Sequence, residues 1–276
     1  MSADLHCHTF CSDGSDSPEE VVLLAKYRGL SAVAITDHDT LSGGEAAAVC
    51  GKKYGMGVIP GVELSACDAE TGRKAHILGY LCDEPRFLVD LCRATCEARR
   101  IAGEQMLEKV QRLYPLPALM VMRRAERSAS LYKQHIMRAL MDAGYVGEMY
   151  GKEYDRLFSA KNGIAYVPVQ YPEVHEVIER IHRAGGLAVL AHPCEYDGYG
   201  LLTRLAGAHA IDGVEVSHPA NRPGDEERFS AVADQCGLAK TGGTDFHGMY
   251  RKSPVPLGTC TTADVQLKKL LEKKKY

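Results

Sequence analysis

A series of short apolar runs separated by helical patterns constrains the fold of this chain more than any other feature. Seven runs are apolar or rich in β-branched residues and have the length of buried strands: 3–8, 31–36, 57–65, 75–81, 186–192, 213–218 and 239–246. The first helix has a clear start, because Ser17, Pro18 and Glu20 form a capping box ahead of an apolar run. Helix after strand is typical of an α/β barrel or a doubly wound sheet.

This alternation stops between residues 86 and 165, where helical patterns at 87–113, 131–143 and 148–158 follow one another without a convincing strand. Residues 91–165 carry 13 Lys and Arg against 8 Asp and Glu, a net charge of +5, which leaves −8 for the rest of the chain. We therefore predict an α/β barrel domain at 1–85 and 166–276, with a basic helical insert at 86–165 that caps the active site. Residues 268–275 are predicted to form a solvated terminal helix.

The potential metal ligands begin with a pair of histidines on the first predicted strand. His6 and His8 are two residues apart, so their side chains project from the same face, while Cys7 points the other way into packing. Two ring nitrogens can then reach one metal ion. Such a pair often occurs by chance, and its weight depends on the residues that follow.

Further potential ligands follow most of the other predicted strands: Asp13, His38, Glu63, His76, His192, Asp245 and His247. Barrel and open-sheet enzymes place their active sites at the carboxyl ends of strands, and packing does not explain such a repeated pattern. His76 instead starts its strand, which an antiparallel strand after the polar turn at 68–72 would explain. Single histidines are more often structural, and we interpret His175, His182 and His209 in that way.

Five motifs occur in order across nearly the whole chain: His6-x-His8, Thr36-Asp37-His38, Pro60-Gly61-Val62-Glu63, His192-Pro193 and Asp245-Phe246-His247. In these motifs the sequence resembles the PHP family of polymerase-associated and histidinol-phosphatase domains. The resemblance implies a distorted TIM-like (β/α)7 barrel with a two- or three-metal site at its strand ends. The branch of this family with a helical insert includes phosphatases of nucleoside bisphosphates and hydrolases of small cyclic phosphates.

The resemblance also implies which residues hold each ion. The first site would consist of His6, His8, Glu63 and Asp245, the second of the bridging Glu63 with His76 and His192, and the third of Asp13, His38 and His247. Mixed imidazole and carboxylate ligation suits Mn²⁺, Zn²⁺ or Fe²⁺ better than Mg²⁺ or Ca²⁺. Two to three divalent ions would leave a net positive pocket for a phosphate, with a metal-bridging hydroxide as nucleophile.

Other residues are predicted to act on the substrate or to support the ligands. Lys133 and His135 occupy the stretch where related chains show Arg-Pro-His, and they are predicted to bind phosphate. His218 ends a strand and is predicted to be a general acid or a substrate contact. Asp37 is grouped with the catalytic residues because it is predicted to orient a neighbouring imidazole; the alternative is a buried structural hydrogen bond. Glu215 is likewise predicted to support a metal ligand from behind.

Composition limits the other classes of function. The ten cysteines have irregular spacing and are expected to be reduced, and Cys194, beside His192-Pro193, is assigned to packing. No apolar run approaches the roughly 20 residues that span a bilayer, and no secretion signal is evident, so we expect a cytoplasmic protein without a membrane partner. Trp is absent and the insert has few aromatic residues, which disfavours nucleic acid as a partner. The oligomeric state is left open.

The favoured function is therefore a metal-dependent phosphoesterase. It would hydrolyse phosphate monoesters, and also cyclic phosphodiesters, of small phosphorylated ribose or nucleotide compounds such as nucleoside 3′,5′-bisphosphates or ribose cyclic phosphates. Three alternatives stay open: an exonuclease on short RNA or DNA, a non-catalytic metal-binding regulatory module, and a carbon–nitrogen hydrolase on the same metal scaffold.

Overall fold

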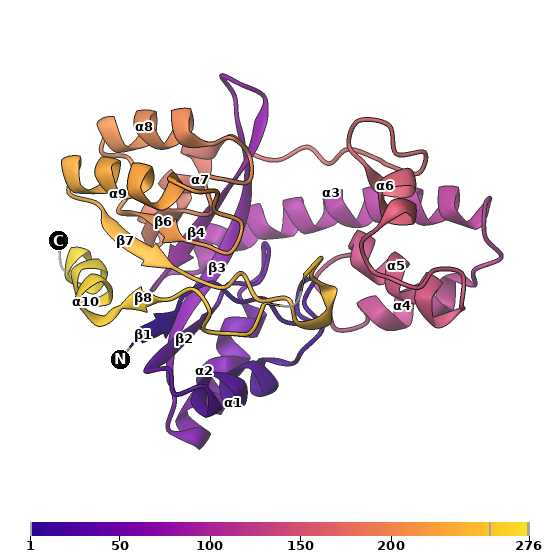
Figure 1. Cartoon of the computed structure of the whole chain (residues 1–276), viewed down its shortest axis with the longest axis horizontal. Helices are drawn as coiled ribbons and strands as arrows, with labels where there is room; N and C mark the ends of the chain where they lie inside the picture. The colour runs from indigo at the N-terminus through magenta and orange to yellow at the C-terminus, as the bar shows by residue number, and fades with distance from the viewer. Residues whose placement is uncertain (1, 254, 275–276) are drawn as a thin grey trace.

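Eight strands form one sheet that curves into a nearly closed barrel in the computed structural model, which describes residues 2–253 and 255–274 (Figure 1). The strands are β1 (Ser2–Asp4), β2 (Ala32–Ile35), β3 (Gly57–Asp68), β4 (Arg73–Tyr80), β5 (Leu187–Leu190), β6 (Gly213–Ser217), β7 (Ala239–Gly242) and β8 (Thr262–Ala263). Their order in the sheet is β7-β6-β5-β4-β3-β2-β1-β8. The predicted distorted α/β barrel is confirmed.

The two ends of the sheet meet through the segments that follow β1 and β7. The Leu5 amide donates to the Gly242 carbonyl at 3.3 Å, and the His8 amide donates to the Phe246 carbonyl at 2.8 Å. The prediction of seven strands missed β8, which has two residues and pairs antiparallel with β1. The first strand was also predicted too long, because β1 ends at Asp4 and only an isolated bridge joins Cys7 to Phe246 further on.

One strand runs against the direction of its neighbours. The strands β1, β2 and β3 are mutually parallel, and so are β5, β6 and β7, but β4 is antiparallel to both β3 and β5. The expectation of an antiparallel strand at His76 is therefore confirmed. Because β4 is reversed, its first residues lie at the edge of the barrel where the parallel strands end.

Helices cover the outside of the barrel: α1 (Pro18–Tyr27), α2 (Ser42–Tyr54), α7 (Val174–Arg183), α8 (Tyr199–Gly207), α9 (Asp225–Gln235) and α10 (Asp264–Lys273). In Figure 1, α1 and α2 lie on one side of the sheet, and α8 and α9 on the other. The predicted capping box is confirmed, since Ser17 Oγ accepts from the Glu20 amide at 3.1 Å and the Glu20 carboxylate accepts from the Ser17 amide at 2.7 Å. The α10 helix covers most of the predicted terminal helix, whose residue 275 lies outside the described residues.

The chain leaves the barrel after β4 and forms four helices before it returns at α7: α3 (Arg86–Gln111), α4 (Ala118–Ala125), α5 (Lys133–Asp142) and α6 (Lys152–Phe158). Of these, α4 was not predicted from the sequence. The four helices share a hydrophobic cluster, which includes Leu107, Val121, Ile136 and Leu157 and which Tyr250 joins from the segment after β7. They extend to one side of the barrel in Figure 1. Among the described residues, no helix is long and apolar enough to cross a membrane.

Candidate metal centre

A single buried carboxylate, that of Glu63, lies at the centre of the site. Glu63 is in the middle of β3, and its side chain is enclosed by five imidazoles from four different segments of the chain. The Oε2 atom lies 3.1–3.2 Å from ring nitrogens of His6, His8 and His38, and Oε1 lies 2.8 Å from His76 Nδ1 and 2.9 Å from His192 Nε2. Each carboxylate oxygen thus faces a different group of potential ligands.

The first predicted ligand set is assembled. His6 Nε2 and His8 Nε2 lie 3.5 Å and 3.2 Å from Asp245 Oδ1. Together with Glu63 these residues offer ligand atoms that all lie within 4.8 Å of one another, and all four residues are buried. Cys7, on the opposite face as predicted, packs in a hydrophobic cluster with α1 and β2.

The second predicted set lies at the other oxygen of Glu63. His76 Nδ1 is 3.4 Å from His192 Nε2, and both nitrogens contact Oε1 of Glu63. The reversed direction of β4 places His76 here, because Ser65 pairs with His76 and Glu63 pairs with Leu78. A diagonal pair of this kind lies on one face of an antiparallel ladder.

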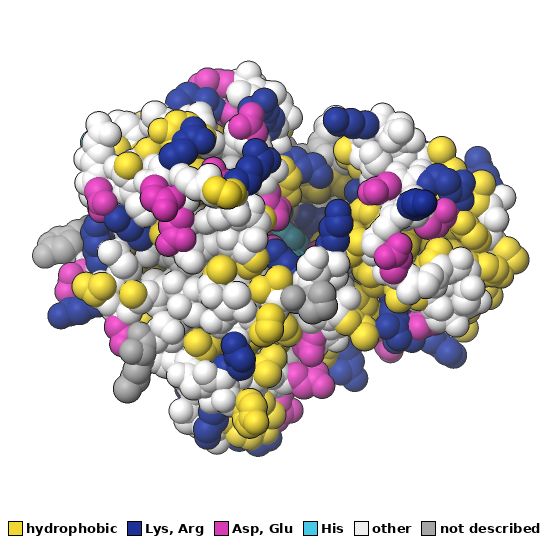
Figure 2. Space-filling view, in the orientation of Figure 1, with side chains coloured by type: hydrophobic (Ala, Val, Ile, Leu, Met, Phe, Trp, Pro, Cys, Tyr) yellow, Lys and Arg dark blue, Asp and Glu magenta, His cyan; other side chains and the backbone are white. Residues whose placement is uncertain are grey.

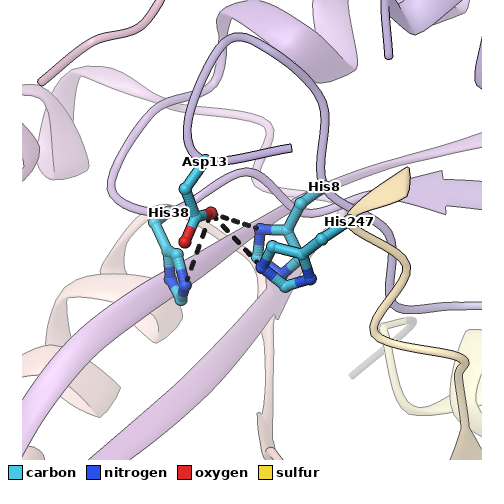
Figure 3. A group of neighbouring side chains, drawn as sticks. All are labelled: His8, Asp13, His38 and His247. Carbon is cyan, nitrogen blue, oxygen red and sulfur yellow. Dashed lines mark ion pairs between the residues drawn. The ribbon is translucent and has the colours of Figure 1, made fainter. Parts of the chain in front are cut away.

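The third predicted set lies on the other side of His8 and is shown in Figure 3. Asp13 Oδ1 is 3.3 Å from His247 Nε2 and 3.9 Å from His38 Nε2. Its distance from His8 Nδ1 is 3.8 Å, so His8 contacts this group as well as the first one. All nine predicted metal ligands therefore lie in one continuous cluster.

The buried atoms of the cluster lack hydrogen-bond partners of their own. His6 Nε2, His8 Nε2, His38 Nδ1, Asp13 Oδ1 and Glu63 Oε2 are all buried and without a hydrogen bond. Native proteins rarely leave so many buried polar atoms unsatisfied in one place. Imidazole nitrogens and carboxylate oxygens at this spacing fit divalent cations, which would satisfy these atoms together.

The charges of the cluster favour ionised carboxylates. Burial alone would raise the pKa of Glu63, but the facing His76 and His38 imidazoles hold that pKa well below its usual range. For Asp13 and Asp245, too, burial alone would raise the pKa, but neighbouring imidazoles, His247 first among them, lower it. Divalent cations would therefore meet carboxylates that are already deprotonated.

Three imidazoles, those of His6, His8 and His192, would have to release protons when an ion binds, since, against the effect of burial, Glu215 and Glu63 also hold the pKa of His6 well above its usual range. Against the effect of burial, carboxylates raise the pKa of His8 to about 10 and that of His192 to about 9. For His8 the carboxylates are Asp245 and Glu63, and for His192 the main one is Glu63. Only the neutral imidazole is a ligand, so metal binding at this cluster displaces protons.

Glu215, on β6, holds two of the ligands in place. Its carboxylate lies 3.1 and 3.2 Å from His6 Nδ1, which leaves His6 Nε2 facing Glu63, and it accepts from the His192 backbone amide at 2.8 Å. A carboxylate behind an imidazole fixes the tautomer and direction of a metal ligand. These contacts match the supporting role predicted for Glu215.

The contacts of Asp37 are with the loop that follows His8, and one of them, Ser12 Oγ, also lies 3.5 Å from His8 Nδ1, so both the structural and the orienting roles of Asp37 stay predictions. The Oδ1 atom of Asp37 accepts from the Thr9 amide at 2.7 Å and from Ser12 Oγ at 2.6 Å, and its Oδ2 accepts from Thr9 Oγ1 at 2.7 Å. Both oxygens are thus occupied by the loop that carries Asp13. Asp37 holds the loop at Thr9 and Ser12.

His218 lies at the rim of the first ligand set. Its Nδ1 accepts from the Ala220 amide at 3.1 Å, so the neutral ring carries its proton on Nε2, which lies 3.5 Å from Asp245 Oδ2. A protonated Nε2 is a hydrogen-bond donor and not a metal ligand. Burial raises the pKa of the neighbouring Cys194 thiol to about 12, which fits the packing role assigned to it and not a nucleophile.

The two residues predicted to bind phosphate differ in their positions. Lys133, at the start of α5, lines a cavity beside the cluster. His135 is buried, and its Nδ1 accepts from the Tyr132 amide at 3.2 Å. Burial lowers the pKa of His135 to about 4, so this ring stays neutral, and it belongs to the start of the helix and not to the wall of either cavity described below.

A cavity of about 400 Å³ lies over the cluster, between the barrel and the helical insert. Figure 2 shows this hollow, with histidine at its floor and basic side chains near its rim. Arg251 was not predicted from the sequence, although it follows the last ligand motif by only four residues; its Nη1 lies 2.9 Å from Asp245 Oδ2. Gln134, which donates to Asp13 Oδ2 at 3.1 Å, was not predicted either.

Three of the six described residues other than glycine that have a positive φ angle lie in or beside the ligand motifs. His192, Asp245 and Asp39 have φ angles of 20°, 49° and 53°, in a region that residues with a side chain rarely adopt. Two of the three are predicted ligands, and the third directly follows His38. Strained residues persist where the surrounding structure enforces them, which is common at functional sites.

The barrel and its cluster of imidazoles and carboxylates define a metal-dependent hydrolase with its active site at the strand ends. The model of the PHP domain family matches residues 4–188, which is more than half of the chain. The chain therefore belongs to the PHP domain family, and it is a metal-dependent phosphoesterase.

Several curated relatives match over almost their whole length. The chain is 37% identical over 256 residues to the phosphoribosyl 1,2-cyclic phosphate 1,2-diphosphodiesterase of Eggerthella lenta, covering 92% of this chain and 97% of the relative. It is 32% identical to the 3′,5′-nucleoside bisphosphate phosphatase of Chromobacterium violaceum, covering 88% of this chain and 86% of the relative. It is also 31% identical to the 5′-3′ exoribonuclease of Haemophilus influenzae, covering 88% of this chain and 89% of the relative.

Solved structures give the same result for the fold. A protein from Bifidobacterium adolescentis assigned as a metal-dependent phosphoesterase is similar with a TM-score of 0.87 and 30% identity, over 98% of this chain and 96% of that chain. A Chromobacterium violaceum protein assigned as an amidohydrolase, with bound sulfate and no metal, is similar with a TM-score of 0.83 and 28% identity, over 99% and 97%.

Proposed function

We propose that this enzyme hydrolyses phosphate monoesters, and also cyclic phosphodiesters, of small phosphorylated ribose or nucleotide compounds. The observation that carries the proposal is the ligand cluster around Glu63, which opens into a cavity of about 400 Å³ beneath the helical insert. That volume is within the range of small-molecule sites. The relatives named for a phosphoribosyl cyclic phosphate and for nucleoside bisphosphates support this substrate class.

Two or three divalent ions, with Mn²⁺, Zn²⁺ or Fe²⁺ as candidates, would be held in the three predicted ligand sets. When bound, such ions supply Lewis acidity to the phosphoryl oxygens and activate water at neutral pH. Residues behind the ligands hold them in position: Glu215 binds the His6 ring and the His192 backbone amide, and Gln134 donates a hydrogen bond to Asp13. These hydrogen bonds orient the ligand atoms of each set toward a shared metal position before substrate binds.

Two side chains are proposed to act on the substrate. His218 presents its Nε2 proton toward Asp245 Oδ2, beside the first ligand set, and would donate to the departing ester oxygen as that oxygen gains charge. Arg251 lines the cavity, and a guanidinium there would bind phosphoryl oxygens. We leave Asp37 and His135 out of the reaction because both oxygens of Asp37 and the Nδ1 atom of His135 accept hydrogen bonds within the fold, and neither residue lines the cavity.

We also propose that residues 86–165 form a separate insert that caps the site. Three of its contacts support this role: the Ala129 amide donates to the Cys11 carbonyl, Ser128 Oγ donates to the Ser12 carbonyl, and Gln134 reaches Asp13. The insert would thereby exclude long substrates and bulk water. All ten cysteines are free, which supports the reducing cytoplasm as the compartment.

The second candidate function is an exoribonuclease on short RNA, which the relatives of that name favour. One experiment distinguishes the two candidate functions. Purified enzyme with Mn²⁺ is offered nucleoside bisphosphates, ribose cyclic phosphates, sugar phosphates and a 5′-phosphorylated oligoribonucleotide, and product formation is followed by phosphate assay and chromatography. We expect turnover of the small compounds only. Release of mononucleotides from the oligonucleotide at a comparable kcat/KM would select the second candidate, and no turnover of any compound would refute both.

A further inference from the structure

The helical insert contributes one buried positive charge to its contact with the barrel. Of the lysines and arginines that the structure describes, only Arg99 is buried. It lies on α3, in the wall of a second cavity of about 190 Å³ beside the metal cluster, which Lys74, Lys133 and His38 also line. Arg99 Nη2 donates to Asp39 Oδ2 at 2.7 Å. Because burial of two charges costs desolvation energy, such a pair adds little net stability and favours a role in placing its neighbours.

Asp39 directly follows the metal ligand His38 and closes the turn after it. Its φ angle of 53° lies in a region that residues with a side chain rarely adopt, so the turn depends on contacts that hold it. The Asp39 carboxylate accepts from the Ser65 amide and from Ser65 Oγ, both at 2.9 Å. Arg99 Nη2 donates to the same Ser65 Oγ at 2.8 Å. The guanidinium, the carboxylate and the hydroxyl therefore contact one another and fix the turn.

Two more residues of the insert contact the same short stretch of backbone. Cys96 Sγ donates to the Asp39 carbonyl at 3.4 Å. Tyr132 Oη donates to the His38 carbonyl, also at 3.4 Å, and accepts from Arg99 Nη1 at 3.2 Å. The Tyr132 ring lies 6.2 Å from the His38 ring, with 23° between their planes. Arg99 thus holds the backbone on both sides of the peptide that joins His38 to Asp39.

His38 depends on these contacts more than the neighbouring ligand Glu63 does. Glu63 lies inside β3, where it pairs with Leu78 of β4 in a continuous ladder. His38 lies between strand and helix, because β2 ends at Ile35 and α2 begins at Ser42, and an isolated bridge joins it to Glu63. The direction of the His38 ring is therefore set largely by the side chains that hold its backbone.

We propose that Arg99 is a positioning residue for the third ligand set. By holding the turn at Asp39 and the hydroxyl of Tyr132, it directs the His38 ring toward the metal position shared with Asp13. The insert thereby completes a metal position in addition to covering the cavity. This inference rests on the proposed function, since it takes the third ligand set to hold a divalent ion.

The test measures metal binding in place of activity. Mn²⁺ is added to metal-free protein by equilibrium dialysis, and the bound metal per chain is determined by elemental analysis. The Asp13→Asn variant changes a ligand of the third set directly, so the equivalent that it weakens belongs to that set. In Arg99→Gln the same equivalent is expected to bind about 10–100-fold more weakly, while the other equivalents keep their wild-type affinity.

Two milder variants test the route from Arg99 to His38. Arg99→Lys keeps a positive charge near Asp39 but loses the fork that also reaches Tyr132, so it should recover part of the lost affinity. Tyr132→Phe keeps the ring and removes the hydroxyl between Arg99 and the His38 carbonyl, so it should weaken the same equivalent by less than Arg99→Gln does. An effect of either variant on a different equivalent would contradict this route.

Two controls on α3 separate positioning from loss of stability. Arg100→Gln removes a neighbouring arginine that pairs with Glu97 and Glu104 on the same helix, and it should leave every equivalent unchanged. Leu107→Ala truncates a buried side chain of the insert, so it should lower the melting temperature and keep the third-set equivalent. Retention of that equivalent in Arg99→Gln, or its loss in Leu107→Ala as well, would overturn the inference.

The same titration separates this inference from the proposed function. Selective weakening of the third-set equivalent in Arg99→Gln supports the positioning role even if no compound of the panel is hydrolysed. A wild-type protein without any equivalent that Asp13→Asn weakens would overturn the positioning role even if the enzyme hydrolyses phosphate esters.

Discussion

Replacing Glu215 by glutamine is expected to weaken metal binding at the first ligand set without removing a ligand. The carboxylate receives two donors, the His6 Nδ1 proton at 3.1–3.2 Å and the His192 amide at 2.8 Å. A glutamine amide has one oxygen to accept with and an NH2 group that only donates. With the amide oxygen at the Oε2 position, which contacts both donors, the NH2 group takes the Oε1 position 3.1 Å from His6 Nδ1 and places a donor against the donor of that ring.

The magnitude follows from these contacts. A buried donor left without an acceptor costs about 1–3 kcal/mol, which is expected as a loss of stability in the metal-free protein. Loss of the carboxylate behind a metal-ligating imidazole lowers metal affinity about 10–100-fold. That factor corresponds to about 1.4–2.8 kcal/mol per ion. Glu215→Gln should thus need correspondingly more Mn²⁺ for half-maximal activity.

The assay is a Mn²⁺ titration of kcat/KM, with metal content measured after dialysis at each concentration. Asp212→Asn is a matched control, because the Asp212 carboxylate also accepts from a backbone amide, that of Ala188 at 2.8 Å, and contacts an imidazole, that of His182 at 3.0 Å. These contacts lie at the start of β5, at the opposite edge of the barrel. The control should lose stability but keep the wild-type Mn²⁺ midpoint.

Two results would refute this reasoning. If Glu215→Gln had the same Mn²⁺ midpoint as the wild-type enzyme, the carboxylate would not be orienting His6 as a ligand. If activity stayed low at saturating Mn²⁺ while metal content was restored, Glu215 would be acting on the reaction itself and not through metal binding.

Three further predictions concern the metal, the barrel closure and pH. Removal of the metal ions with a chelator should abolish phosphate release and lower the melting temperature, because the buried imidazoles and carboxylates lose the ions that they share. Addition of Mn²⁺ should restore both the activity and the melting temperature. An unchanged melting temperature after chelation would contradict a structural contribution of the ions. Gly243→Ala would place a Cβ 2.3 Å from His6 Cβ. The free energy of unfolding, measured with denaturant, is therefore expected to fall by about 1–3 kcal/mol, and the metal content of the protein should also fall. The control Gly207→Ala, whose added Cβ has no atom within 4 Å, should leave stability unchanged or raise it slightly. Because burial lowers the pKa of Lys133 to about 8, its ammonium is present below that pH and lost above it; KM for a bisphosphate should therefore rise above pH 8 in the wild-type enzyme, and that rise should be absent in Lys133→Gln.

The ligand cluster could be predicted from sequence because it depends on position along strands. A potential ligand at the end of a parallel strand must lie at the common edge of the barrel, whatever the details of packing. The order from His6 to His247 therefore implied a cluster, and the structure brings all nine residues together. The one exception, His76, was explained in advance by a reversed strand, and β4 is reversed.

Residues whose position depends on packing of the insert could not be predicted in this way. Lys74 is one of several charges near a hairpin, and Arg99 is one of several on a long helix, so nothing in the sequence separates them from solvated lysines and arginines. Only when α3 packs beside β3 does Arg99 meet Asp39. The resemblance predicts the same role for His135 as for Lys133, but the two residues lie on different sides of α5, because Lys133 lines a cavity and His135 is buried.

The reversed strand explains why one carboxylate can serve two ligand sets. Since β3 continues past Glu63 to Asp68 and turns at Gly72, whose φ is 68°, the chain returns along β3 and pairs His76 with Ser65. A parallel β4 would have placed its last residues at the site and left His76 at the far edge of the barrel. In the observed arrangement Glu63 lies inside the strand with one oxygen toward the His6 side and the other toward His76. The bridging position of Glu63 is thus a consequence of strand direction, which the sequence signals only through the short polar turn at 68–72.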